Sequence, residues 1–157
     1  MLSLYFRLTI TAFIFGTVLI SRFWDHDCEI NVTYIGGPTA LLEWDDIRLL
    51  TDPTFDPTGQ EYQYGPVVLK KLAGPALSPE SLGRVDAVLL SHDHHLDNLD
   101  HSGRKFLPKA KQVITTTAGA ERLGGNVAGL SNWQSTEIAR DSRVLRITGM
   151  QRKPISP

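Results

Sequence analysis

A dense cluster of ionisable and amide side chains follows one apolar stretch of the chain. Three of the five histidines lie in this cluster with three aspartates and an asparagine: His92, Asp93, His94, His95, Asp97, Asn98 and Asp100. Imidazole nitrogens and carboxylate oxygens bind zinc at about 2.0 to 2.2 Å. A loop that leaves a buried strand can bring several of them to one ion, because its backbone is fixed at one end. We therefore expect a metal site in this loop rather than an incidental polar turn.

The elements that must position this loop are short strands. An apolar run of strand length, residues 85–90, ends where the cluster begins. Upstream, alternating β-branched and apolar residues predict a three-stranded meander over residues 30–35, 39–44 and 47–51, with turns at Gly36-Gly37-Pro38 and Asp45-Asp46. Downstream, residues 111–116 and 143–148 favour strands, and residues 118–123 favour a short helix. This alternation of strands and short helices indicates an α/β domain.

The connection over residues 54–81 is rich in proline and glycine and is long for a simple link. We expect a functional or lid-like loop with little regular structure. A short helical turn is expected at residues 78–80, where serine suits an N-cap and proline the first helical position.

The beginning of the chain differs in composition from the rest. Residues 8–20 are almost wholly apolar, with Arg7 before them and Arg22 after them. This length suits a signal-like segment or a marginal membrane anchor, although no small-residue cleavage motif follows. We divide the chain into this segment, residues 1–28, and a domain, residues 29–157. If the segment is genuine, residues 1–24 direct the chain to a membrane or to export; if it is a translated extension, a cytoplasmic location is expected.

Charge and cysteine content exclude some classes of function. The 157-residue chain has a net charge of −1 and no run of lysines or arginines, so we expect no nucleic-acid partner. Its single cysteine, Cys28, cannot form an internal disulfide.

Residues 88–100 resemble the strand and loop signature of the metallo-β-lactamase superfamily, whose usual pattern is His-x-His-x-Asp-His. The Thr51-Asp52-Pro53 motif and the proline- and glycine-rich loop after it are most similar to the ascorbate-6-phosphate-lactonase-like branch. The resemblance covers about residues 29–148. It implies the N-terminal half of an αβ/βα sandwich and a zinc hydrolase, in which metal-activated water attacks an ester, lactone or phosphodiester of an unknown small molecule.

The pattern fits this chain only with a one-residue insertion, because a strict reading from His92 puts Leu96 where the aspartate belongs. The resemblance then assigns His92 and one of His94 and His95 to a first zinc ion. It assigns Asp97 to a second ion and to orienting the catalytic water. Two further residues would support the ligands: Asp52, which would accept a histidine N–H or else form a turn with Pro53, and Asn98, which stands where the last histidine belongs. An amide is a poor zinc ligand, so the second ion is expected to be weak or absent.

The superfamily pattern also requires two more histidines and a bridging aspartate, and this chain has no histidine after His101. We therefore expect strands for only one of the two sheets, with an apolar face left uncovered. Two hypotheses follow. The chain is a hydrolase whose site is completed by a longer form, another chain or self-association, or it is an inactive truncated half-domain, either a pseudogene product or an interaction module.

Overall fold

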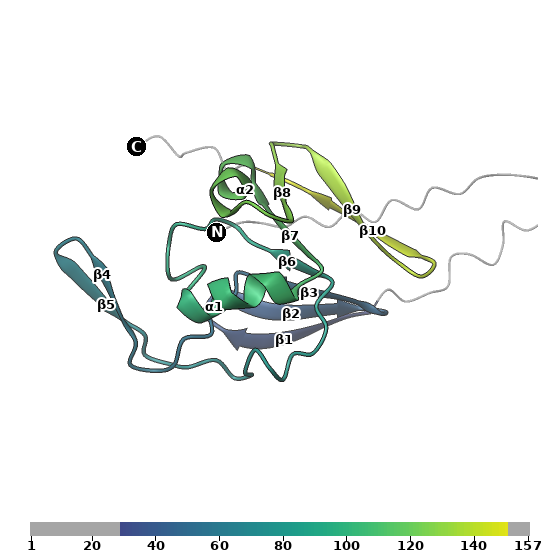
Figure 1. Ribbon diagram of the computed structural model, residues 1–157. Coiled ribbons are helices and arrows are strands. Elements are labelled where there is room, and N and C mark those ends of the chain that lie inside the picture. The colour runs from purple at the N-terminus through teal and green to yellow at the C-terminus, as the bar shows by residue number, and fades with distance from the viewer. Residues whose placement is uncertain (1–28, 151–157) are drawn as a thin grey trace, which may run out of the picture.

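A computed structural model describes residues 29–150 of the protein (Figure 1). The predictions for residues 1–28 and for the last seven residues lie outside this described range. Within it, no helix has the length and apolar character needed to span a bilayer.

The centre of the fold is a six-stranded mixed sheet with the strand order β1-β2-β3-β6-β7-β8. Strands β1 (Ile30–Gly36), β2 (Thr39–Trp44) and β3 (Ile47–Thr51) form the predicted antiparallel meander. Strands β6 (Ala87–Leu89), β7 (Gln112–Thr116) and β8 (Val127–Leu130) continue from β3 in parallel. The expected α/β class is confirmed, and the parallel half brings the carboxyl ends of four strands to one edge.

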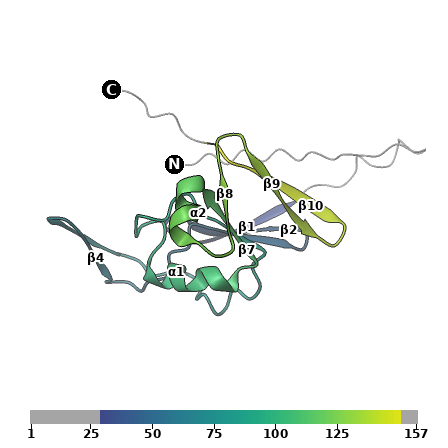
Figure 2. The ribbon, with the colours of Figure 1, turned by 45° about the horizontal axis from the view of Figure 1, so that its top comes forward.

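Successive residues of each central strand point to opposite faces of the sheet, and both faces are apolar. Leu50, Val88 and Val113 face one side, where they pack with Phe106 of helix α1 (His101–Phe106). Leu49, Leu89 and Ile114 face the other side, where they pack with Ile138, Leu145 and Ile147. The last three belong to a hairpin of β9 (Ser135–Arg140) and β10 (Arg143–Thr148), which lies across the face opposite α1 (Figure 2).

The expectation that one apolar face has no cover was therefore wrong over β3, β6 and β7. The chain after β8 folds back as a hairpin, because β9 follows a turn at Trp133 and supplies a second strand for β10. The hairpin leaves part of β1 uncovered. Ile30, Val32 and Tyr34 are 46%, 62% and 67% exposed, so the outer end of this face remains apolar and open to solvent.

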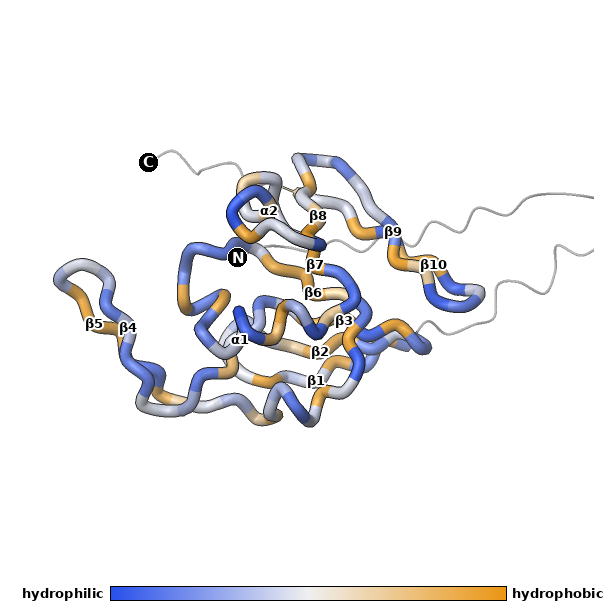
Figure 3. The backbone as a smooth tube through the Cα atoms, in the orientation of Figure 1, coloured by the Kyte–Doolittle hydropathy of each residue, from blue (hydrophilic) through white to orange (hydrophobic). Residues whose placement is uncertain are grey.

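The segment after β3 is more regular than expected. Strands β4 (Glu61–Tyr64) and β5 (Val67–Lys70) form a hairpin that projects from the body of the molecule (Figure 1). The expectation of little regular structure was wrong, because alternating tyrosines and a valine-rich run flank the Gly65-Pro66 turn, and Gly65 has a φ of 55°. The predicted helical turn at residues 78–80 is a hydrogen-bonded turn and not a helix. Figure 3 shows the apolar character of β5 in this projecting arm.

Short helices connect the parallel strands. Helix α1 and the 3-10 helix η1 (Leu107–Lys109) precede β7, and helix α2 (Thr117–Leu123) follows it. The predictions of α2, β7 and β10 are confirmed. Helix α1 was not predicted, because it has only six residues and begins directly after the polar cluster, whose last member, Asp100, is its N-cap.

Candidate metal and active site

The polar residues gather where the parallel strands end. Asp52 follows β3, Ser91 follows β6 closely, and Thr116 and Thr117 join β7 to α2. A cavity of about 770 Å³ opens at this edge and is lined by Asp52, Ser91, His92, Asn98 and Thr115, among others. Such edges are the usual place for ligand sites in sheets of this kind.

The structure brings the three loop histidines together. Their ring centroids lie 4.2 to 5.0 Å apart, and His92 Nε2 lies 3.0 Å from His95 Nδ1. Two nitrogen ligands of one tetrahedral zinc ion lie about 3.3 Å apart when each bond is about 2.05 Å. His92 and His95 are therefore spaced like a ligand pair. The side chain of His94 is 55% exposed, and its Nδ1 lies 4.0 Å from Asp93 Oδ1.

Burial and the neighbouring imidazoles of His95 and His94 lower the pKa of His92 below its ordinary value. The neutral ring, which is the form that binds metal, is favoured as a result. A third ligand does not join the pair: between residues 29 and 150, no group of three or more histidine, cysteine, aspartate or glutamate side chains is placed to hold an ion. The loop thus fits a metal ion as a partial set of donors.

Ser91 connects the ligand pair to the residues expected to support it. Its backbone N–H donates to Asp52 Oδ1 at 2.6 Å, and its Oγ lies 2.9 Å from His92 Nδ1. The side-chain amide of Asn98 donates to the same Oγ at 3.0 Å. Asp52 and Asn98 therefore both reach His92 through Ser91. With His92 Nδ1–H donating to Ser91, the Nε2 atom carries a lone pair, which accepts from His95 Nδ1 in this structure and is the pair that an ion would use.

Asp52 occupies an unusual position. Its φ of 28° lies in the left-handed region, which aspartate tolerates better than most residues. Burial raises the pKa of its carboxyl, outweighing the hydrogen bonds from Ser91 and Asn98. Thr39 Oγ1, at the start of β2, donates to the Asp52 carbonyl at 2.7 Å and so holds this strained residue. No pattern in the sequence indicated the roles of Ser91 and Thr39.

Asp97 faces a different cavity from His92. This second cavity, also about 770 Å³, lies between the loop and the β4–β5 hairpin, and Asn98 borders both cavities. The negative charge of Asp97 is close enough to raise the pKa of His92 slightly against the larger effects that lower it. The structure therefore places Asp97 beside the histidines rather than among them.

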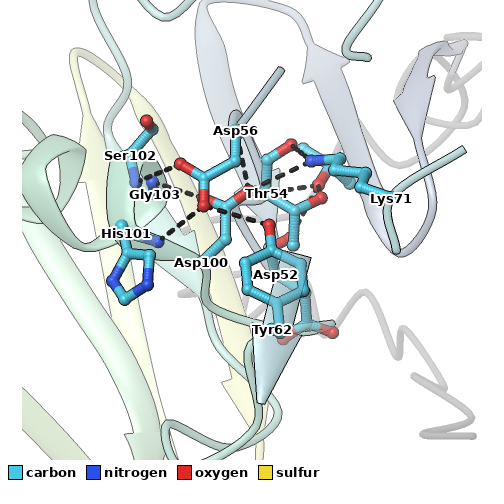
Figure 4. Close-up of polar contacts among 10 residues, drawn as sticks. Asp52, Thr54, Asp56, Tyr62, Lys71, Asp100, His101, Ser102 and Gly103 are labelled. Carbon is cyan, nitrogen blue, oxygen red and sulfur yellow. Dashed lines mark hydrogen bonds and ion pairs between the residues drawn. The ribbon is translucent and has the colours of Figure 1, made fainter. Parts of the chain in front are cut away.

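A buried polar cluster fixes the surroundings of the loop (Figure 4). Asp100 is fully buried and accepts hydrogen bonds from Gly103 N at 2.7 Å, Asp56 N at 2.6 Å and Lys71 Nζ at 3.0 Å. Asp56 accepts from Tyr62 Oη at 3.0 Å and from the start of α1. These contacts join the base of the β4–β5 hairpin to α1. Partners up to 46 positions apart leave no local pattern, so sequence reasoning missed Asp56, Tyr62 and Lys71.

The acid stability of the protein should depend on Asp56. Burial opposes its ionisation, but hydrogen bonds from Ser102, Tyr62 and His101 outweigh burial and lower its pKa. A lowered pKa stabilises the fold above the ordinary carboxyl value of about 3.9, and this contribution disappears as the pH falls through the folded-state value. We expect Asp56→Asn to be less stable than wild type at neutral pH, with the difference shrinking at acid pH. Urea unfolding over a pH series measures this; a difference independent of pH would contradict it.

Comparison with known proteins places these features in a family. A model of the beta-lactamase superfamily domain matches residues 31–154. The chain belongs to the metallo-β-lactamase superfamily. The predicted family is thereby confirmed at the level of the superfamily, whereas its lactonase-like branch stays a prediction.

Several known proteins align with parts of the chain. An uncharacterized protein of Mycobacterium tuberculosis is 43% identical over 73 residues, which is 46% of this chain and 18% of that protein. N-acyl-phosphatidylethanolamine-hydrolyzing phospholipase D 1 of Caenorhabditis elegans is 26% identical over 127 residues, or 73% of this chain and 35% of that protein. The mitochondrial N-acyl-phosphatidylethanolamine-hydrolyzing phospholipase D of Saccharomyces cerevisiae is 25% identical over 130 residues, which is 77% of this chain and 26% of that protein.

Two solved structures share the superfamily fold. A possible metal-dependent hydrolase from Veillonella parvula superposes with a TM-score of 0.55 and 24% identity, covering 68% of this chain and 43% of that one. Isothiocyanate hydrolase from Delia radicum gut bacteria superposes with a TM-score of 0.54 and 22% identity, and the match covers 67% of this chain and 42% of that one. The chain thus spans between 18% and 43% of the lengths of these proteins.

Proposed function

We propose that this chain carries the metal-binding loop of a metal-dependent hydrolase, with His92 and His95 as ligands of one zinc ion and Asp97 as the residue that orients water. The observation that supports this most directly is the 3.0 Å spacing of His92 Nε2 and His95 Nδ1 at the carboxyl edge of the parallel strands. Both His94 and His95 are exposed, and the contact of His95 Nδ1 with His92 Nε2 favours His95 as the second ligand. His94 would remain at the entrance to the site.

The chain's own residues would prepare this site for hydrolysis. A bound zinc ion would supply a water of lowered pKa, able to attack an ester, lactone or phosphodiester. Ser91 would hold the His92 ring through Nδ1, and Asp52 would hold Ser91 through its backbone N–H. Asp97 would orient the attacking water from the side of the second cavity. Asn98 donates its amide to Ser91, so it would support the first ion rather than bind a second one.

The relatives favour one bond class over the others. Two of them are named for hydrolysing N-acyl-phosphatidylethanolamine as phospholipases D, and such enzymes cleave a phosphodiester. We therefore place a phosphodiester ahead of a lactone for this chain. Lactone hydrolysis remains the reaction suggested by the Thr51-Asp52-Pro53 motif.

Zinc titration of single-histidine variants tests the ligand assignment. We expect the wild-type chain to bind one zinc ion in the micromolar range or weaker, because no group of three or more ligand side chains is placed to hold an ion among residues 29–150. His92→Ala and His95→Ala should each weaken binding by at least the roughly 10- to 100-fold that loss of a supporting residue costs. His94→Ala should have a smaller effect.

His101→Ala is the matched control, since His101 lies in α1 and faces Tyr62 rather than the loop histidines. Isothermal titration of all four variants gives stoichiometry and affinity together. Two tightly bound ions per chain would contradict the proposed site. A loss in His94→Ala equal to that in His95→Ala would contradict the choice of His95.

The exposed apolar strip on β1 supports a second candidate, an interaction module that self-associates. Ile30, Val32 and Tyr34 alternate on one face of an edge strand, which is an unusual surface for a protein that remains alone. Sedimentation over a range of concentrations distinguishes the two roles when turnover is measured in parallel with a His92→Ala/Asp97→Ala double variant. Turnover equal to that of the double variant, together with a stable dimer, would favour the module over the hydrolase.

A further inference from the structure

We propose that Arg122 and Arg104 clamp Asp93 and so position the ligand histidines on either side of it. This inference rests on the proposed metal site, because the clamp acts on the loop that carries the ligands. Asp93 is the loop residue that the superfamily pattern left without a role. The structure gives it two partners from two different helices.

The first partner holds the carboxylate. Arg122, from α2, donates Nε–H to Asp93 Oδ1 and Oδ2 at 3.1 and 2.9 Å, and its Nη2 also contacts Oδ1. The Asp93 side chain is only 5% exposed, although it lies between His92 and His94, and the His94 side chain is 55% exposed. Charge-assisted contacts of a guanidinium to both carboxylate oxygens fix orientation as well as distance. Asp93 therefore points to α2 and away from the role of a free ligand.

The second partner holds the backbone at the same residue. Arg104, from α1, donates Nη2–H to the Asp93 carbonyl oxygen at 2.6 Å. Because Asp93 lies between His92 and His94 and two positions before His95, fixing its side chain and its carbonyl fixes the path of the chain through all three histidines. The far end of the loop is held separately, by Leu99 N–H on the His95 carbonyl and by Leu96 N–H on Tyr64 Oη.

A different role for Asp93 makes the opposite prediction. If its carboxylate were itself a metal ligand, Arg122 would compete with the ion, and removing Arg122 would tighten metal binding. If Arg122 is a positioning residue, removing it loosens the loop and weakens binding. The sign of the change in zinc affinity therefore separates the two roles.

The experiment compares Arg122→Gln, Asp93→Asn and the double variant with the full wild-type chain. Zinc dissociation constants are measured by competition with a chromophoric chelator, at a temperature where circular dichroism shows each variant folded. We expect each single substitution to weaken binding by about 10- to 100-fold, as losses of residues that support ligands do. The double variant should be no weaker than either single variant, because all three remove the same interaction.

Arg140→Gln is the matched control. It breaks another pair between an arginine and a buried aspartate, Arg140 Nη1 to Asp86 Oδ1 at 3.2 Å, at the opposite end of β6 from the loop. This variant should lose stability but keep its zinc affinity. If it weakens zinc binding as much as Arg122→Gln does, the effect is general destabilisation and the clamp is overturned. Tighter binding by Arg122→Gln would also overturn it.

A measurement on the metal-free protein tests the effect of Arg122 on the histidines independently of whether the chain binds zinc. Long-range ¹H–¹⁵N spectra report the environment of each imidazole without added metal. Arg122→Gln should shift the His92 and His95 resonances, and Arg140→Gln should leave them unchanged. If the wild-type chain binds no zinc, the metal site fails, but these spectra still decide the clamp. Unshifted histidine resonances in Arg122→Gln would overturn it.

Discussion

Replacing Gly103 by alanine is expected to destabilise the protein by about 3 kcal/mol or more, at or beyond the upper end of ordinary overpacking. A Cβ atom on Gly103 would lie 1.8 Å from the Pro53 carbonyl oxygen and 2.7 Å from its carbonyl carbon. Neither atom belongs to a side chain that can rotate away. Either α1 or the backbone after β3 must therefore move, and α1 is held by the buried Phe106.

The same substitution should disturb the candidate site. Pro53 directly follows Asp52, and Gly103 lies three residues after Asp100, so the clash separates the two segments that flank the histidine loop. Urea unfolding followed by circular dichroism gives the loss of stability. Lys105→Ala is the control, because Lys105 is exposed on the same helix and should change stability by less than about 0.5 kcal/mol. A Gly103→Ala protein as stable as Lys105→Ala would show that the close approach is not required.

Replacing Asp100 by alanine is expected to cost about 3 to 5 kcal/mol, the usual cost of removing one partner from a buried ion pair. The carboxylate is completely buried, and the Lys71 side chain opposite it is only 17% exposed. Alanine would leave that ammonium group without its counter-charge. It would also leave the N–H groups of Asp56 and Gly103 without their acceptor.

Glu61→Ala is the control for Asp100→Ala. Glu61 pairs with Lys70 at 3.7 Å, but both side chains are about 60% exposed, so this pair should contribute less than about 1 kcal/mol. Asp100→Asn should be intermediate, because its amide oxygen can still accept one N–H while the charge opposite Lys71 is lost. Equal unfolding free energies for Asp100→Ala and Glu61→Ala would contradict the structural role of the cluster.

Local patterns in the sequence predicted most of the strands. Alternation with a period of two residues marks β1, β2 and β3, and a short apolar run marks β6, because a strand exposes alternate side chains to different surroundings. The abrupt change from Leu90 to Ser91 located the candidate site at a strand end. These patterns are formed by residues close together in the sequence, so they can be recognised without knowledge of the tertiary structure.

Patterns of the same kind did not predict strands that are very short or that depend on pairing with a distant segment. The β4–β5 hairpin has strands of four residues, too short for a clear period, within a segment whose glycines and prolines indicated a loop. Strand β9 was missed because its small and polar residues resemble a surface loop until β10 pairs with it. The site residues and the zinc ion themselves remain predictions, which the titrations above will test.

The sequence by itself determined the α/β class, the superfamily and the loop that carries the histidines, since each follows from residues within a few positions of one another. Only the tertiary structure decided how that loop is held. Asp93 meets Arg122 across 29 positions, and Asp52 meets Ser91 across 39. Contacts between segments so far apart arise from the packing of strands and helices, so a pattern of residues adjacent in the sequence does not predict them. The type of a residue shows which hydrogen bonds its side chain can donate or accept, but the tertiary structure determines which residue is its partner.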